Sequence, residues 1–372
     1  MTKRICVPIT NRTNYSKLKT IMIELRERFG PDALQIVASS TILLEKYGKA
    51  FEDLLKDGFR IDKKIDCILM NDSHEAMAKT VGLSIIEHSS HFAEKKPDML
   101  LVVGDRFDML APVVAASMMN VPVVHVQGGE TSGTIDNTVR NVISRFARHH
   151  FVATDLSRRH LLDQGLPAST VHNFGCPAVE YISKIDVGPA FNTRKLAKRF
   201  KRELAISEKD KYLLVMVHPD TTLDHDVDMN MLLDTVQSFK MPTLVFYPNA
   251  DAKNFQIVSA MAKHKENHDF YMLRHMPLED FVNTMAHAAC MIGNSSAGIR
   301  EAALFGTPVI NIGSRQAGRE RNRNVIDVAG DDSTALRDAI ARHLDYRFPR
   351  DNIYYQEGCT RRIVDVLARE LS

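Results

Sequence analysis

The stretch Gly293–Asn311, GNSSAGIREAALFGTPVIN, follows an apolar segment. It begins with small residues, continues as an amphipathic segment and ends in a second apolar segment. This pattern predicts a β-strand, a tight turn, a helix and another buried strand. Backbone N–H groups at the start of such a helix point at whatever lies beside Ser295–Gly298, and a diphosphate is a suitable guest. The alternative is an ordinary β–α turn in which a serine caps the helix.

Short apolar runs and amphipathic stretches alternate over the rest of the chain as well. Runs that are apolar throughout are typical of strands buried on both faces of a parallel sheet. The pattern predicts an α/β protein with two doubly wound, Rossmann-like domains, an architecture like that of the glycosyltransferase-B fold. Strands are expected at 4–10, 34–39, 99–104, 121–126, 150–154, 211–218, 243–249, 290–296 and 308–313. Helices are expected at 15–28, 74–95, 109–120, 138–149, 230–239, 257–264, 297–304 and 360–371.

The division into two domains follows from length and from a pause in the alternation. A chain of 372 residues exceeds what one hydrophobic core usually organises. The alternation stops around 182–192, where Gly188 and Pro189 interrupt regular structure. We therefore expect an N-terminal domain over 1–182 and a C-terminal domain over 183–372, with the alternative that the last helix crosses back to the first domain.

Composition excludes several classes of protein. The 48 Lys and Arg balance 46 Asp and Glu and are interspersed, so no broad basic face is expected and nucleic acid is not an expected partner. The five cysteines are odd in number and lack C-x-x-C spacing, which disfavours a disulfide framework and a thiolate metal site. No apolar run has signal-peptide or membrane-spanning length, so we expect a cytoplasmic protein without a membrane partner.

In the second half, polar residues follow the predicted strands. Glu301 lies one turn into the expected helix, where a carboxylate could accept both ribose hydroxyls or simply complement the helix dipole. His218 ends an apolar strand, which makes ligand binding about as probable as a structural role. Four arginines follow the strand PVINIG; some could clamp phosphate, and at least two are expected to be solvated: Arg315, Arg319, Arg321 and Arg323.

The first half offers a matching set at the carboxyl ends of its strands, where open α/β sheets bind ligands. Arg12 and Lys17 lie in the expected loop NRTNYSK after the first strand. Asp105 closes the strand MLLVV, and Glu130 and Asp136 lie in the Gly-rich loop GGETSGTIDN. Carboxylates that converge in a cleft are candidates for proton transfer. Helix capping is the alternative for Glu130 and the expected role of Asp108.

Seven segments, taken in order, resemble the hydrolysing UDP-N-acetylglucosamine 2-epimerases, including the epimerase half of the bifunctional animal enzyme that starts sialic acid synthesis. The resemblance covers nearly the whole chain. The segments are NRTNYSKL, VVGDRFDMLA, GGETSGTID, VHPDTT, YPNADA, HAACMIGNSSAGIREAALFGTPVIN and GSRQAGRE.

The resemblance implies a metal-free reaction without a cofactor, in a homodimer or homotetramer of amino-sugar metabolism. Loss of the C2 proton and departure of UDP from UDP-N-acetylglucosamine give a glycal, and water then adds to give N-acetylmannosamine. Taken together with the strand-end residues above, the expected catalytic residues are Asp105, Gln127, Glu130, Asp136 and His218. The expected substrate- and UDP-binding residues are Arg12, Lys17, Arg106, Asn294, Ser295, Ser296, Gly298, Glu301, Arg315 and Arg319.

Two departures from the family pattern concern the chemistry. The family has a carboxylate two residues after the strand-end His, whereas this chain has Gln127, a neutral amide that exchanges no proton at pH 7. The stretch 38–48, ASSTILLEKYG, also lacks the His that the family often has there.

Three explanations of Gln127 are open. It is an engineered change that traps a substrate complex, which the missing loop His disfavours; or it is natural and Glu130 or another group takes over; or the chain acts on a different nucleotide sugar or nucleoside. A binding protein without turnover and a true glycosyltransferase are further alternatives.

Overall fold

A computed structural model of the chain describes residues 3–45, 51–71, 73–193, 206–207, 209–222, 227–249, 251–274 and 276–371. Its contacts divide the chain into two compact units. The first unit consists of Met1–Tyr181 together with Tyr354–Ser372, and the second of Ile182–Ile353. The first unit is therefore built from two separate pieces of the chain.

The first unit is built on a seven-stranded sheet in the order β3-β2-β1-β4-β5-β6-β7, and every strand pairing in it is parallel. The order runs outward in both directions from β1 and β4, as in a doubly wound Rossmann-like sheet. The strands are β1 (Ile5–Ile9), β2 (Leu34–Ser39), β3 (Lys63–Ile65), β4 (Met99–Val103), β5 (Val123–Val126), β6 (Ala147–Val152) and β7 (Val171–Asn173).

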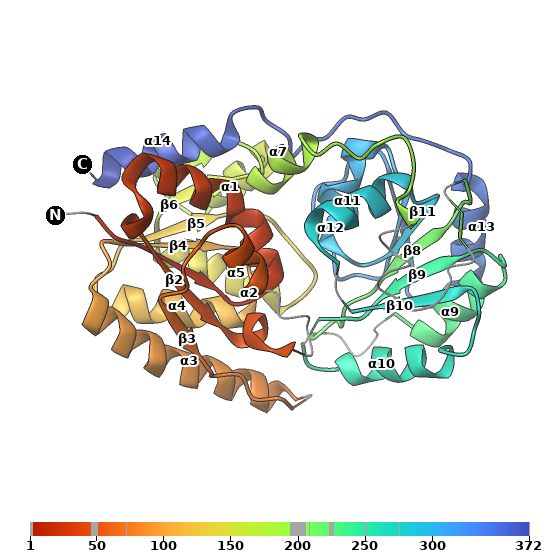
Figure 1. Cartoon of the computed structure of the whole chain (residues 1–372), viewed down its shortest axis with the longest axis horizontal. Coiled ribbons are helices and arrows are strands. Elements are labelled where there is room, and N and C mark those ends of the chain that lie inside the picture. Colours follow the sequence, from red (N-terminus) through yellow and green to blue (C-terminus); the bar gives the residue numbers. More distant parts are fainter. Residues whose placement is uncertain are drawn as a thin grey trace. The chain divides into compact units, whose positions relative to one another are not determined.

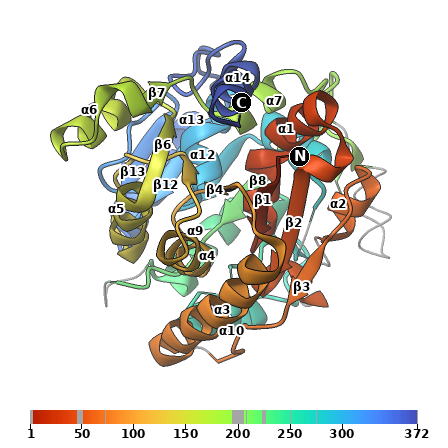
Figure 2. The ribbon, with the colours of Figure 1, turned by 90° about the vertical axis from the view of Figure 1, so that its left-hand side faces the viewer.

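Helices cover both faces of this sheet, as Figures 1 and 2 show. Strand side chains alternate between the faces, so Ile5, Val7 and Ile9 enter one core and Cys6 enters the other. One face carries α1 (Arg12–Phe29) and α14 (Cys359–Leu371), and the other carries α3 (His74–Lys95), α4 (Phe107–Met118) and α5 (Ile135–Phe146). The remaining helices are α2 (Phe51–Lys56), α6 (Asp155–Asp163) and α7 (Pro177–Ser183), with 3-10 turns η1 (Pro31–Ala33), η2 (Ser40–Leu43) and η4 (Ala168–Thr170).

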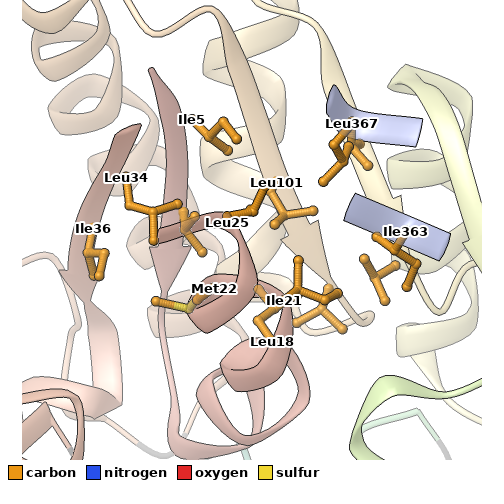
Figure 3. Close-up of a cluster of buried hydrophobic side chains, with 14 of the residues drawn as sticks. Ile5, Leu18, Ile21, Met22, Leu25, Leu34, Ile36, Leu101, Ile363 and Leu367 are labelled. Atoms are coloured by element: carbon orange, nitrogen blue, oxygen red, sulfur yellow. The ribbon is translucent and has the colours of Figure 1, made fainter. Parts of the chain in front are cut away.

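Helix α14 completes the first core although it is the last element of the chain. Figure 3 shows its Ile363 on the side of Leu18 and Ile21 of α1, and its Leu367 nearer to Leu101 of β4. All five side chains are fully buried. Glu180 fastens the start of the helix, because its carboxylate accepts hydrogen bonds from the Gly358 N–H at 2.9 Å and the Thr360 N–H at 2.8 Å.

The second unit repeats the doubly wound plan with six parallel strands in the order β10-β9-β8-β11-β12-β13. The strands are β8 (Leu213–Met216), β9 (Thr243–Phe246), β10 (Phe270–Leu273), β11 (Cys290–Gly293), β12 (Val309–Ile312) and β13 (Val325–Val328). The helices are α9 (Met229–Gln237), α10 (Asn254–Lys263), α11 (Leu278–His287), α12 (Ser296–Arg300) and α13 (Ser333–His343), with the 3-10 turn η5 (Ala302–Phe305).

Three expected boundaries are wrong. The segment NRTNYSK is mostly helix, because α1 begins at Arg12 behind a capping box formed by Asn11 and Asn14. The helix expected over 138–149 ends at Phe146, and Ala147–Val152 instead forms β6 beside β5. The single helix expected over 297–304 is two short pieces, α12 and η5, which places Glu301 at the C-cap of α12.

The helices of the described part of the chain were also compared with the length and hydropathy that a membrane span needs. None of them is long and apolar enough to cross a bilayer.

Candidate functional site

The first candidate cluster lies where the strand order of the first unit reverses, at the carboxyl ends of β1 and β4. This is the position at which open α/β sheets bind their ligands. Asn14, in the first turns of α1, joins the two strand ends: its Oδ1 accepts from the Thr10 N–H at 3.2 Å and its Nδ2 donates to the Val103 carbonyl at 3.4 Å. Asp105 follows β4 at this point, and its side chain retains 17% exposure.

Arg140 of α5 is the centre of this cluster, and its side chain is fully buried. One guanidinium nitrogen donates to the Glu130 carbonyl at 2.7 Å and to Asn137 Oδ1 at 3.2 Å. The other donates to Ser132 Oγ at 3.1 Å and to the carboxylate of Asp105. One side chain therefore ties the end of β4 to the Gly-rich loop.

The sequence analysis does not single out Arg140. A signal is present, because Asp136, Arg140 and Ser144 recur at intervals of four and so form a polar stripe on a helix whose other inward residues are apolar.

Arg106 is the neighbour of Asp105 and has its own buried counter-charge. Its guanidinium lies 3.6 Å from Asp108 Oδ2, and the Asp108 side chain is 1% exposed. The same Oδ2 accepts from Ser40 Oγ, at the end of β2, at 3.2 Å. The expected capping role of Asp108 is wrong: Arg106 occupies the N-cap position of α4 and Asp108 contacts side chains instead. Asp105 is thus paired with the buried Arg140, and the adjacent Arg106 is paired with the buried Asp108.

Strand β5 brings His125 and Gln127 to the same edge. His125 is fully buried, and its Nε2 donates to the Gly104 carbonyl at 2.8 Å, so Nδ1 accepts from Ser144 Oγ at 3.0 Å. Burial lowers the pKa of His125 to about 4, so the ring is neutral. Gln127 is 1% exposed, adopts a left-handed backbone with φ of 65°, and donates from its amide to Cys176 Sγ at 3.0 Å.

The remaining predicted residues of the first unit differ in setting. Glu130 is buried, and Asp136 is half-buried in the first turn of α5. Lys17 is buried within α1, whereas Arg12, the first residue of that helix, is half-buried. The two lie about 140° apart around the helix axis, so they do not share a face. Desolvation lowers the pKa of Arg12, and the nearby Asp53 carboxylate raises it.

In the second unit the strand order reverses between β8 and β11, and Asn294 connects these two strand ends. Its Oδ1 accepts from the His218 N–H at 2.7 Å and its Nδ2 donates to the His218 carbonyl at 2.8 Å. His218 Nδ1 accepts from the Asn249 N–H at 3.2 Å, so the proton of the neutral ring lies on Nε2. Asn294 thus orients the backbone of His218.

The turn that follows β11 is built partly for packing. Ser295 caps α12 and accepts from the Ala297 N–H at 3.3 Å, while the Gly298 N–H donates to the Ser295 carbonyl at 3.2 Å. A Cβ on Gly298 would lie 2.7 Å from Val309 Cγ1, so the helix needs glycine to approach β12. Ser296 is half-buried and Glu301 is 9% exposed. The backbone N–H groups of Ala297 and Gly298 already have acceptors within the turn.

The four arginines after β12 separate into two pairs. Arg315 is half-buried and donates to the Asn294 carbonyl at 3.2 Å, and Arg319 is 6% exposed. Arg321 pairs with Asp327 at 3.1 Å, and Arg323, 75% exposed, lies 3.5 Å from Asp351. Arg321 also donates to the carbonyls of Gln316 and Arg319 at 2.8 Å, so it holds the loop that carries Arg315 and Arg319.

Within the described residues, His, Cys, Asp and Glu side chains do not gather in any group of three that could hold a metal ion. The cluster in each unit consists instead of carboxylates, guanidinium groups, hydroxyls and neutral imidazoles. Such groups can bind phosphate and transfer protons.

Comparison with known proteins identifies the family. The family model described as UDP-N-acetylglucosamine 2-epimerase matches residues 29–368. The chain belongs to this family. Its members are enzymes, and the resemblance drawn from the sequence segments is confirmed.

Two curated relatives in the family are similar over most of their length. The UDP-N,N'-diacetylbacillosamine 2-epimerase (hydrolyzing) of Legionella pneumophila is 31% identical over 88% of this chain and 85% of its own. The GDP/UDP-N,N'-diacetylbacillosamine 2-epimerase (hydrolyzing) of Campylobacter jejuni is 32% identical over 87% of this chain and 84% of its own.

Among solved structures, the UDP-GlcNAc 2-epimerase of Neisseria meningitidis, bound to UDP-GlcNAc, aligns with a TM-score of 0.81 at 16% identity. The alignment covers 98% of this chain and 100% of that one. The predicted fold class, two Rossmann-like α/β domains of the glycosyltransferase-B type, is confirmed.

Proposed function

We propose that the chain is a hydrolysing 2-epimerase that eliminates UDP from UDP-N-acetylglucosamine, or from a close relative such as UDP-N,N'-diacetylbacillosamine, and adds water to the resulting glycal. With UDP-N-acetylglucosamine the products are N-acetylmannosamine and UDP. The observation that carries the proposal is the cluster at the ends of β4 and β5, where Arg140 binds the carboxylate of Asp105 and the main-chain carbonyl of Glu130, in a chain of this family. The relatives' names support the second substrate.

Each residue has a role that follows from its chemistry. Asp105, Glu130 and Asp136 are the carboxylates that take the C2 proton and handle water. Gln127 contributes a neutral amide beside them. In the second unit, His218 contacts the diphosphate or sugar through its Nε2–H, and Glu301 accepts the ribose hydroxyls.

The phosphates are bound by the remaining polar set. Because the N–H groups of Ala297 and Gly298 have acceptors within the turn, the hydroxyls of Ser295 and Ser296 and the guanidinium groups carry more of the binding. The other members of this set are Arg12, Lys17, Arg106, Asn294, Arg315 and Arg319.

The proposal is tested by incubating the protein in D₂O with each of the two UDP-sugars. Elimination removes the C2 proton and the addition of water returns one from solvent, so UDP is released and the free sugar carries deuterium at C2. UDP release without deuterium at C2 would indicate simple hydrolysis and contradict the proposal. Absence of UDP from both sugars would contradict any hydrolase function.

A second function, nucleotide-sugar binding without turnover, is favoured by one observation: Gln127 is an amide that engages Cys176 at 3.0 Å. Gln127→Glu distinguishes the two, because a carboxylate there can still accept a hydrogen bond from the thiol. A large gain in UDP release means that the amide blocks the reaction. A measurable parent rate that is unchanged or lower in Gln127→Glu, with UDP binding preserved in calorimetry, is what the first proposal expects.

The proposed assembly is a homodimer or homotetramer. Helices α3, α4 and α5 pack side by side on the first unit, as Figure 2 shows. Their outer surface exposes Leu83 (43%), Ile86 (63%), Met118 (68%) and Phe146 (37%). Exposed apolar side chains on neighbouring helices are candidates for an association surface. Light scattering behind size exclusion should give a mass of two or four chains, and a single-chain mass would contradict the proposed assembly.

A further inference from the structure

We propose that Arg140 is a positioning residue that keeps Asp105 ionised and aimed for proton transfer. The inference rests on the proposed function, in which the Asp105 carboxylate exchanges a proton with the substrate or with water. Arg140 itself need not touch the substrate, since its side chain is fully buried on α5.

Arg140 contacts its partners through both terminal nitrogens of the guanidinium group. Its two terminal nitrogens contact four oxygens: the Glu130 carbonyl, Asn137 Oδ1, Ser132 Oγ and the Asp105 carboxylate. Of these, only Asp105 carries a formal negative charge. A rigid guanidinium fork that is fixed by the other three leaves one orientation for the fourth.

Because Arg140 is buried, its positive charge needs the neighbouring negative charge of Asp105 for the fold to be stable. A fully buried guanidinium is strongly destabilising unless an opposite charge lies beside it. In turn, a cation at this distance favours the carboxylate form of an acid. Among the groups around the pair, His125 is neutral because burial, with the Arg140 charge adding to it, lowers its pKa to about 4.

The loop role and the charge role of Arg140 can be separated by experiment. If Arg140 only fastened the Gly-rich loop, its removal would lower stability and turnover equally at every pH. If it acts through Asp105, its removal changes the pH at which Asp105 becomes protonated, and it has little further effect once Asp105 is Asn.

The experiment uses the full chain with Arg140→Met, Arg140→Lys, Asp105→Asn and the double variant Arg140→Met/Asp105→Asn. Arg145→Met is the matched control, because Arg145 lies on the same helix, is exposed and donates to the Gln164 carbonyl. The readouts are UDP release against pH and the midpoint of thermal unfolding.

For Arg140→Met, the acid limb of kcat/KM should move up by about 1–3 pH units. Arg140→Lys, which retains the charge, should keep the limb in place while kcat falls, and Arg145→Met should match the parent. The inference is overturned if the acid limb of kcat/KM stays in place in Arg140→Met. It is also overturned if the limb of Arg140→Lys shifts as far as that of Arg140→Met.

Thermal unfolding tests the pair without turnover. The double variant should lose less than the sum of the two single losses, because each single change leaves one charge unpaired. Additive losses overturn the pairing. If Arg140→Met alone does not fold, a folded double variant supports the pairing, and failure of both overturns it. If the parent releases no UDP, the proposed function fails, and this cycle still decides whether Arg140 and Asp105 are coupled.

Discussion

At the scale of single residues, Asn294 shows how a predicted ligand residue can act indirectly. Both polar atoms of its amide are used on the backbone of His218, and its own carbonyl accepts from Arg315 and Gln316. Since Asn294 lies at the end of β11 and His218 beyond β8, the amide sets the distance between two strand ends of the second unit. Its contribution to UDP binding then goes through the residues that it holds.

Replacing Asn294 by Leu should therefore weaken both the fold and the site. It leaves the partly buried N–H and carbonyl of His218 without the Asn294 amide, at a cost of about 1–3 kcal/mol in the free energy of unfolding. UDP affinity, measured by calorimetry, should fall as well. Gln256→Leu, an exposed amide on α10, is the control and should change neither. Unchanged stability in Asn294→Leu would contradict the structural role.

Glu130 is one of the carboxylates proposed to transfer a proton, and removing its charge tests that role directly. Glu130→Gln retains the size of the side chain and removes its charge, so UDP release should fall by about 10²–10⁴-fold while UDP binding is retained. Glu94→Gln, on the exposed surface of α3, is the matched control. Equal rates in the parent and Glu130→Gln would remove Glu130 from the catalytic set.

Residue types, strand-end positions and the family resemblance together predict the candidate set, but not what each residue contacts. Asp105 could be predicted because a carboxylate follows an apolar strand. The polar stripe on α5 could have marked Arg140 as a candidate, but its partners could not be predicted, because they come from a strand end and a loop outside that helix. Asp108 was expected to cap α4, and only the folded chain places Ser40 and Arg106 beside it.

At the scale of elements, α14 is the helix whose packing has the clearest measurable consequence. Leu367→Ala removes a fully buried side chain from the core shared with α1 and should cost about 2–5 kcal/mol, seen as a lower urea midpoint. Arg361→Ala, exposed on the same helix, should stay within about 0.5 kcal/mol of the parent. Equal midpoints for the two variants would mean that α14 does not stabilise the first unit.

Element type was predictable where periodicity is strong, as in α3, which begins and ends where expected. Element ends were less predictable for physical reasons. The segment ARHHFV continues the pattern of α5, yet pairing with β5 makes it a strand, and its His149 and His150 are buried there. A helical pattern over 297–304 likewise does not reveal that the chain tightens into a 3-10 turn after Glu301.

At the scale of the whole molecule, buried neutral histidines predict acid sensitivity. Burial lowers the pKa of His88 and His125 to about 4 and that of His150 to about 3, against 6.5 in the unfolded chain. Below pH 6.5 these histidines bind protons in the unfolded chain but not in the folded chain. The stability that they contribute is therefore fully present above pH 6.5 and is progressively lost as the pH falls toward 4. Each can change the free energy of unfolding by up to about 1.4 kcal/mol per pH unit.

Urea unfolding at a series of pH values between 7.5 and 4.5 measures this slope. His150→Phe should reduce the slope by about one proton, because it removes one buried neutral imidazole. His268→Phe, at an exposed position, should leave the slope unchanged. Identical slopes in the parent and His150→Phe would show that His150 does not contribute.

The two-piece construction of the first unit also sets an order of events during synthesis. A ribosome delivers Met1–Tyr181 first, but the core beneath α1 lacks Ile363 and Leu367 until the final turns of the chain emerge. The second unit, Ile182–Ile353, is continuous and can close before that. The part of α1 that packs against α14 therefore lacks its partner throughout translation of the second unit. Apolar surface exposed in this way is prone to aggregate, so we expect the nascent chain to depend on chaperones.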